Sequence, residues 1–147
     1  MRRTATAPED AQRPSQEEVD RALQVAESLR QQLALYEEQR ELLASSHAEA
    51  ERASRALDAL AVAKQGDVIL VPLGAGTFAR MAAVDTSRVL SAVGSGVHVE
   101  GSPQDAQKRL AERAGVLQTT IQRLDAEARD VQGEYARIVR SLQSLEG

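Results

Sequence analysis

The chain has 147 residues, a length that normally corresponds to one domain. Aromatic residues make up only 2% of the sequence against 42% hydrophobic residues overall, so its apolar mass suits helix seams better than a thick core. The net charge of −4, without a block of like charge, argues against nucleic-acid binding, and the absence of cysteine excludes disulfides and thiolate metal sites.

The N-terminal segment, residues 1–14, is polar and contains Pro8 and Pro14, which predicts a disordered tail. It lacks the apolar core of a signal peptide. No apolar stretch of the chain approaches the roughly 20 residues that are needed to span a bilayer. The sequence therefore predicts a soluble, cytoplasmic protein.

A long helix is predicted over residues 15–65. Ser15 and Glu18 form a capping box at its start, and Gly66 stands where a C-terminal helix cap belongs. Apolar residues recur at alternating spacings of three and four, as in the seam of a coiled coil, with three polar exceptions in the middle. The seam positions are Val19, Ala22, Ala26, Leu29, Leu33, Tyr36, Arg40, Leu43, His47, Ala50, Ser54, Leu57 and Ala61.

Residues 66–101 are predicted to form two successive β-hairpins. Each contains a Gly-x-Gly triplet, at Gly74–Gly76 and at Gly94–Gly96, whose glycines readily take the positive φ that tight hairpin turns demand. The strands expected on either side of these triplets and of the Asp85-Thr86-Ser87 turn are residues 68–73, 77–84, 88–93 and 97–100.

The Gly-x-Gly triplets also raise the alternative of a phosphate-binding loop. A dinucleotide fingerprint would need a third glycine at Ala79 or Val99, and a P-loop would need a Gly-Lys-Ser/Thr triplet, which the chain lacks. His47 and His98 are far apart, and neither has metal-ligand spacing to a second ligand. The sequence thus predicts no catalytic residue, no cofactor site, no metal site and no enzymatic activity.

The second long helix is predicted over residues 102–147. Ser102, Pro103 and Asp105 provide an N-cap, a proline at the first helical position and an acid in the first turn. Gly115 and Gly133 fall on the outer face of this helix. Its seam positions, at strict spacings of four and three, are all apolar: Leu110, Ala114, Leu117, Ile121, Leu124, Ala128, Val131, Tyr135, Ile138, Leu142 and Leu145.

Two long helices on either side of a short insert can fold back as an antiparallel coiled coil, with Leu57 roughly opposite Leu110. A two-helix stem cannot bury four short strands, and open strand edges aggregate. Strands from several chains are therefore expected to close into a barrel or stacked sheets. The residues predicted to mediate this subunit assembly are Val68, Ile69, Leu70, Val71, Phe78, Val84, Val89, Leu90 and Val93.

The free ends of the two helices are expected to meet in a distal tip. A two-helix seam uses about two positions in seven, so Leu23, Val25 and Val139 are surplus to it, unless they only thicken the seam. Exposed apolar side chains on helix ends suit weak binding to many unfolded chains. The apolar residues expected at or near this tip are Val19, Leu23, Val25, Leu29, Ile138, Val139, Leu142 and Leu145.

Three stretches of the insert carry a family resemblance: GDVILVPLGAGTF at 66–78, the Asp85-Thr86 turn, and VGSGVHVE at 93–100. In this helix–hairpins–helix order the chain resembles the alpha subunit of prefoldin, an archaeal and eukaryotic chaperone. With the flanking coils, the resemblance covers residues 15–147 as one prefoldin-like domain and leaves out the N-terminal tail. The family usually has another small residue and a bulkier aliphatic residue around Ser91, Ala92 and Val93.

The resemblance implies an α+β fold: a long antiparallel two-helix coiled coil with two central β-hairpins that join an intersubunit β-barrel platform. It implies a hexamer of two alpha and four beta subunits, with two hairpins in alpha-type and one in beta-type subunits. It also implies ATP-independent capture of unfolded client proteins, for which the tip residues named above are the predicted client-binding residues. The captured clients would then be delivered to a group II chaperonin. The alternative is a coiled-coil scaffold or adaptor that uses the same fold for assembly only.

Overall fold

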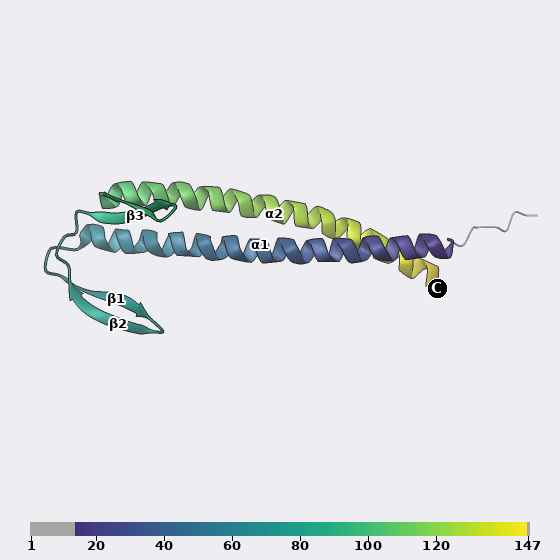
Figure 1. The fold of residues 1–147 in the computed structure, drawn as a ribbon, viewed down its shortest axis with the longest axis horizontal. Coiled ribbons are helices and arrows are strands. Elements are labelled where there is room, and N and C mark those ends of the chain that lie inside the picture. Colours follow the sequence, from purple (N-terminus) through teal and green to yellow (C-terminus); the bar gives the residue numbers. More distant parts are fainter. Residues whose placement is uncertain (1–13, 147) are drawn as a thin grey trace, which may run out of the picture. The chain divides into compact units, whose positions relative to one another are not determined.

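The computed structural model describes residues 14–146, so the predicted N-terminal tail, apart from Pro14, lies outside the described residues. Two long helices enclose two β-hairpins in the sequence, which confirms the predicted α+β fold (Figure 1). In chain order, the elements are α1 (Gln16–Val62), β1 (Val68–Gly74), β2 (Thr77–Ala82), β3 (Val89–Gly94), β4 (Val97–Gly101) and α2 (Pro103–Glu146).

The chain divides into two compact units. The helical unit contains the described residues up to Glu41 and from Gln122 onward, and the hairpin unit contains Leu42–Ile121. Both long helices contribute to both units, because α1 and α2 each include one of these boundaries.

Both helices begin at the caps that the sequence predicts. The Glu18 N–H donates to the Ser15 hydroxyl at 3.3 Å, and the Ser15 N–H donates to the Glu18 carboxylate at 2.8 Å, which completes the capping box. At the start of α2 the Asp105 N–H donates to the Ser102 hydroxyl at 3.1 Å, and Pro103 occupies the first helical position. Local sequence alone therefore determines where each helix starts.

The end of α1 lies at Val62, earlier than the sequence predicted. The chain leaves the helix because Asp67 closes a turn: its carboxylate accepts the Lys64 N–H at 2.8 Å, and its own N–H donates to the Lys64 carbonyl at 3.0 Å. Gly66, with a φ of 91°, then donates its N–H to the Ala83 carbonyl at 2.7 Å. This turn joins the beginning of the first hairpin to its end.

In the helical unit, α1 and α2 pack along the predicted coiled-coil seam. Ala26, Leu29 and Leu124 are buried, whereas Arg40, a polar seam position, is exposed. Nine further seam residues of this unit are half-buried: Val19, Ala22, Leu33, Tyr36, Ala128, Val131, Tyr135, Ile138 and Leu142. The side chain of Leu145 lies outside the described residues.

In the hairpin unit, the same seam continues with one polar connection across it. Ala50 and Ile121 are buried. The Gln107 amide donates to the Ser54 hydroxyl at 2.8 Å and to the Asp58 carboxylate at 2.9 Å. One of the polar seam positions of α1 is thus used for a hydrogen bond to α2.

The two hairpins form separate two-stranded antiparallel sheets, β1 with β2 and β3 with β4. Their turns have matching geometry: φ is 101°, 48° and 74° across Gly74–Gly76, and 115°, 50° and 74° across Gly94–Gly96. Positive φ at both central residues is the requirement of the two-residue turns that suit strand twist. The interpretation of both triplets as hairpin turns, in place of phosphate loops, is confirmed.

Candidate assembly and client-binding surfaces

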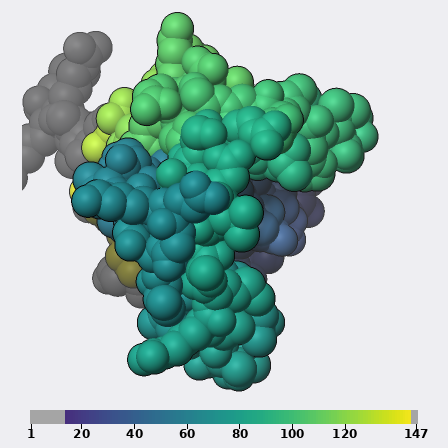
Figure 2. Space-filling view, turned by 90° about the vertical axis from the view of Figure 1, so that its left-hand side faces the viewer, coloured from purple at the N-terminus to yellow at the C-terminus, as the bar shows by residue number. Residues whose placement is uncertain are grey.

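The hairpins carry most of the exposed large apolar side chains of the described chain. Figure 2 shows the surface of the hairpin region, coloured teal. A soluble monomer rarely exposes so many neighbouring apolar groups, so this surface is a candidate interface. The exposed apolar residues of the hairpins and their linker are Val68, Leu70, Leu73, Phe78, Met81, Val84, Leu90, Val93, Val97 and Val99.

Apolar side chains stand on both faces of the first hairpin. Val68 and Leu70 are exposed on one face, and because side chains alternate along a strand, Ile69 and Val71 point to the other. Ile69 is half-buried and lies opposite Met81 of the neighbouring strand, which is itself exposed. A layer on one side of this ribbon would leave the other side in water, so protein must cover both faces to bury it.

The nine predicted assembly residues all lie in the hairpins or in the linker between them. Six of them are exposed, whereas Ile69, Val71 and Val89 are half-buried. Four further exposed apolar residues of the hairpins were not in the predicted set. Each lies on a strand that carries a predicted assembly residue or pairs with such a strand, so the expected strand pairing was the available signal. These are Leu73, Met81, Val97 and Val99.

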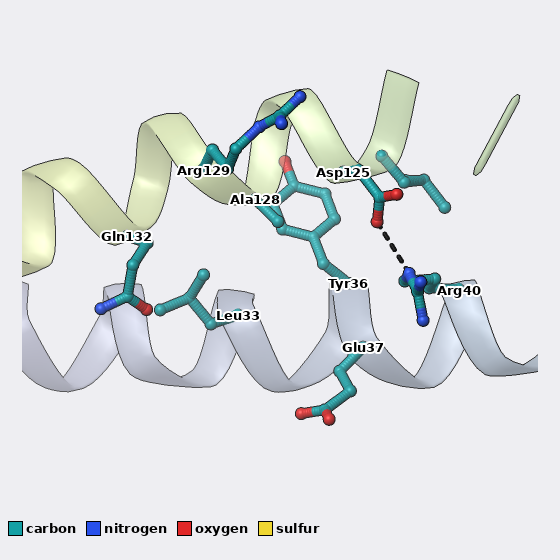
Figure 3. Close-up of a pocket in the computed structure, with 9 residues that line it drawn as sticks. Leu33, Tyr36, Glu37, Arg40, Asp125, Ala128, Arg129 and Gln132 are labelled. Atoms are coloured by element: carbon teal, nitrogen blue, oxygen red, sulfur yellow. Dashed lines mark hydrogen bonds and ion pairs between the residues drawn. The ribbon is translucent and has the colours of Figure 1, made fainter. Parts of the chain in front are cut away.

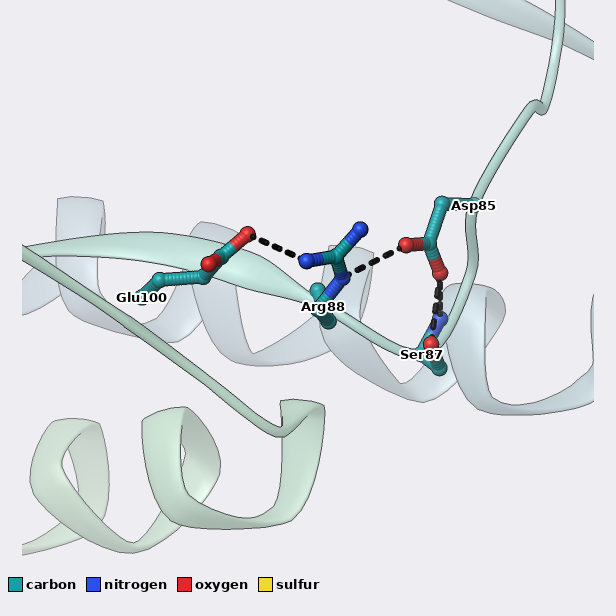
Figure 4. A network of polar contacts seen from close by, with 4 residues as sticks. All are labelled: Asp85, Ser87, Arg88 and Glu100. Atoms are coloured by element: carbon teal, nitrogen blue, oxygen red, sulfur yellow. Dashed lines mark hydrogen bonds and ion pairs between the residues drawn. The ribbon is translucent and has the colours of Figure 1, made fainter.

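A polar cluster organises the linker between β2 and β3 (Figure 4). The Asp85 carboxylate accepts hydrogen bonds from the Ser87 hydroxyl at 2.6 Å, the Ser87 N–H at 2.8 Å and Arg88 Nε at 2.9 Å. The Ser87 hydroxyl and the Arg88 guanidinium therefore hold the pKa of the Asp85 carboxyl well below its usual range. Arg88 also contacts the Glu100 carboxylate at 3.4 Å, which fastens the linker to β4.

The predicted client-binding residues of the helical unit differ in exposure. Leu23 is 52% exposed and Val25 is 44% exposed, so both present apolar surface to water. Leu29 is buried in the seam, and Val139 is half-buried, which fits a residue that thickens the seam. Val19, Ile138 and Leu142 are also half-buried.

Exposed apolar side chains on the helices are not confined to the predicted set. Leu35 and Leu42 of α1 are 57% and 66% exposed, and Val62 and Val116 are also exposed. The sequence held a signal for the two leucines, because both stand outside the seam positions of α1. They provide a natural comparison for Leu23 and Val25 on the same helix.

A cavity of about 480 Å³ in the helical unit lies between the two helices (Figure 3). Leu33 and Tyr36 line it from α1, and Arg40 Nε donates to the Asp125 carboxylate of α2 at 2.7 Å beside it. The Tyr36 hydroxyl accepts a hydrogen bond from the Gln32 amide at 3.2 Å. Arg40 thus replaces an apolar seam contact by an ion pair between the helices.

Residues 14–146 contain no group of three or more His, Cys, Asp or Glu side chains that could hold a metal ion. Within the same described part, none of the helices is long and apolar enough to cross a membrane. The exposed apolar side chains of the hairpins and of the helices are the candidate functional features of the described residues.

Residues 29–146 match the family described as "Prefoldin subunit". The chain belongs to the prefoldin family. Among its relatives, "Prefoldin subunit alpha" of Methanoculleus marisnigri is 31% identical over 114 residues, which cover 78% of this chain and 76% of the relative. "Prefoldin subunit alpha" of Methanococcoides burtonii is 29% identical over 123 residues, covering 84% and 79%.

Solved prefoldin structures share the fold. A filamentous PFD from Methanocaldococcus jannaschii aligns with a TM-score of 0.58 and 19% identity, over 86% of this chain and 98% of that one. The prefoldin beta subunit from Thermococcus strain KS-1 aligns with a TM-score of 0.57 and 19% identity, over 86% and 90%. The relatives in sequence are alpha subunits, so the prediction of an archaeal-type prefoldin alpha subunit is confirmed.

Membership of the prefoldin family makes this chain a chaperone-type subunit that assembles with other prefoldin subunits. Assembly with other subunits accounts for the exposed apolar side chains of the hairpins. Apolar strands that no described segment covers are suited to pair with strands of neighbouring subunits.

Proposed function

We propose that this chain is the alpha-type subunit of a cytoplasmic, ATP-independent holdase. In this proposal two such chains and four beta-type subunits form a hexamer that captures unfolded proteins and delivers them to a group II chaperonin. The subunit itself is not an enzyme and needs no cofactor. Family membership supports this reading, and the observation that carries it is the pair of exposed apolar side chains, Leu23 and Val25, near the start of α1.

The assembly step uses the hairpins. Their strands join those of other subunits in a β-barrel platform, where the exposed edges find backbone partners and both apolar faces become covered. The exposed fractions of Val68 and Leu70, at 68% and 64%, support this role, because they correspond to apolar area that burial in a complex would remove from water.

The capture step uses the helix ends. Leu23 and Val25 are exposed and are not packed in the seam, so they can contact a client, whereas Leu29 is buried in the seam. Each such contact is weak, but several subunits that bind one client together raise its avidity strongly. Weak and repeated contacts suit clients that share exposed apolar groups and no common sequence.

The alternative is a scaffold or adaptor that uses the same fold for assembly only. Leu35 and Leu42 support the scaffold hypothesis, because their exposure shows that an exposed apolar side chain on α1 does not by itself identify a client site. A direct comparison of the two pairs of side chains separates the hypotheses.

The experiment measures how well hexamers suppress the aggregation of a chemically unfolded test protein. Replacing Leu23 and Val25 together by serine should leave the hexamer intact and weaken protection about tenfold, since several contacts are lost at once. The matched control replaces Leu35 and Leu42 by serine, which removes similarly exposed side chains from the same helix.

Equal protection by both variants would contradict a client site at the helix end. Poor protection by the wild-type hexamer would favour the scaffold. Protection should also be the same with and without ATP, and a nucleotide requirement of the purified complex would contradict the proposal.

A further inference from the structure

A groove beside β3 in the hairpin unit has no occupant among the described residues. Its volume is about 570 Å³. Residues 89–92 of β3 form one side, and the two helices form the remainder. The helix residues that line it are Ala53, Ala56, Leu57 and Leu60 of α1 and Ala106, Arg109, Leu110 and Arg113 of α2.

Each helix presents a continuous face to this groove. Both sets of lining residues follow the spacing i, i+3, i+4 and i+7, which places them in one row along a helix. Leu57 and Leu110 belong to the seam and, as predicted, lie near each other, while the flanking alanines and Leu60 extend the apolar surface sideways. Such a widened face is typical of a helix pair against which a third element packs.

The guanidinium of Arg109 in this groove is partly buried, and no ion-pair partner for it lies among the described residues. Its Nε and Nη2 atoms are buried and have no hydrogen-bond partner among the described residues. The guanidinium lies against the end of β4, because a Cβ at Gly101 would stand 3.4 Å from Nη2. Burial of an unpaired cation is costly, and a carboxylate at this place would remove the cost. Arg113 adds a second guanidinium to the same groove.

We propose that this groove binds an apolar segment of a beta-type prefoldin subunit whose carboxylate pairs with Arg109. The inference rests on the proposed assembly and gives it a specific contact. The groove is continuous with the exposed hairpin surface, since Leu90 lines it and is 73% exposed. The occupant therefore reaches the groove as part of the interface that covers β3.

A second copy of this chain is a poorer occupant, because the acids of its hairpin region are already engaged. Within residues 66–101 these acids are Asp67, Asp85 and Glu100. Asp67 accepts the Lys64 N–H, and Arg88 contacts both of the others. An unfolded client is also a poorer occupant, since cations at fixed places select one defined segment and not many sequences.

The test compares two substitutions of Arg109 in the full chain. Arg109→Met keeps the length of the side chain and removes its charge, so it should raise the melting temperature of the isolated subunit by about 3 °C. The same change should weaken assembly with the beta-type subunit of the same organism by at least about tenfold, because the partner carboxylate loses its cation. Arg109→Glu should weaken assembly further. Matched controls are Arg52→Met and Arg52→Glu, at an exposed arginine of α1 outside the groove.

The opposite signs of the two effects distinguish docking from a purely structural role. If Arg109 only holds the fold, Arg109→Met lowers the melting temperature of the isolated subunit, and the proposal fails. If both Arg109 variants assemble with the beta-type subunit as tightly as the wild-type chain does, the docking contact is overturned, whereas the proposed function is not. If the Arg109 variants weaken self-association of this chain, without the beta-type subunit, as much as they weaken assembly with it, the groove is assigned to a second copy and the proposal fails. Failure of the wild-type chain to assemble overturns the proposed function and this contact together.

Discussion

The coiled-coil seam of the helical unit and the strands of the hairpin unit differ in how far the chain itself buries their apolar side chains. In the helical unit, Leu29 of α1 and Leu124 of α2 are buried within the chain itself, with 9% and 6% exposure. In the hairpin unit, Leu70 and Leu90 remain 64% and 73% exposed on strands that pair only within their own hairpins. The seam is therefore stabilised by residues of the same chain, whereas the apolar strands of the hairpins need partners.

This difference has a thermodynamic consequence. Contacts within one chain stabilise it at any concentration, but contacts between chains stabilise it only in proportion to the logarithm of partner concentration. Substitutions in the two units should consequently be read out by different measurements. Folding of the isolated chain reports on the seam, and the assembly state reports on the hairpins.

The largest effect is expected from a charge on the hairpin surface. Leu70→Asp changes a side chain that is 64% exposed in the chain alone, so it should leave the isolated fold intact. In the complex it would bury an unpaired carboxylate, at a cost of several kcal/mol, about enough to abolish hexamers in light scattering. Leu35→Asp in the helical unit, at 57% exposure, is the control and should assemble normally. Normal hexamers of the Leu70 variant would break the comparison between the units.

A cavity in the seam should have a smaller effect, and a different one. Leu124→Ala removes a side chain that is 6% exposed and should destabilise the isolated chain by about 2–4 kcal/mol, measured by thermal unfolding in far-UV circular dichroism. Leu42→Ala, at a position 66% exposed, should cost less than about 0.5 kcal/mol. Similar losses for the two variants would show that the seam does not carry the stability of this chain.

The hairpin turns allow a prediction of stabilisation. Ala75 has a φ of 48°, a conformation that is strained for any residue with a Cβ, so Ala75→Gly should stabilise the first hairpin by about 0.5–1 kcal/mol. Ala79→Gly, in the middle of β2, should destabilise it by a similar amount because glycine there gains only chain entropy in the unfolded state. Hydrogen exchange of the β1–β2 amides measures both. A loss of protection in the Ala75 variant would contradict the turn geometry.

The smallest effect concerns pH and the linker between the hairpins. The pKa of Asp85 is lowered by its bonds to Ser87 and Arg88. The contribution of its carboxylate is therefore complete above the unfolded value of about 3.9, and it is lost as pH falls through the lower, folded pKa. The Ser87 amide signal in NMR should be constant near neutral pH and titrate only in strong acid. In Ser87→Ala the titration should move back toward the ordinary value, and an unchanged midpoint would contradict the assigned cause.

Local patterns in the sequence predicted much of this fold correctly. Ser15 with Glu18, and Ser102 with Pro103, mark helix starts because capping involves residues only a few positions apart. The Gly-x-Gly triplets predict hairpin turns for the same reason, since φ is a property of single residues. The seam followed from periodicity, which a long helix converts directly into one face.

Features that depend on contacts distant in sequence were predicted less well. The end of α1 at Val62 depends on a turn held by Asp67 and on the pairing of Gly66 with Ala83. Leu29 was predicted both in the seam and in the client-binding set, and its degree of burial depends on what packs from α2, which the local sequence does not state. The unpartnered Arg109 could not be foreseen, because nothing in its neighbouring sequence states which atoms surround its guanidinium.

The separation of the two sheets has a consequence for the size of the assembly. In the proposed assembly each hairpin acts as one connector, and because β1–β2 and β3–β4 share no strand pairing, the subunit has two connectors and is divalent. Subunits that all have two connectors extend an array until it closes on itself, whereas a subunit with one connector ends the array. A one-hairpin subunit would act as such a chain terminator, as a monofunctional monomer does in polymer chemistry. The ratio of divalent to univalent subunits, and not the strength of any one contact, would then set how large the particle grows.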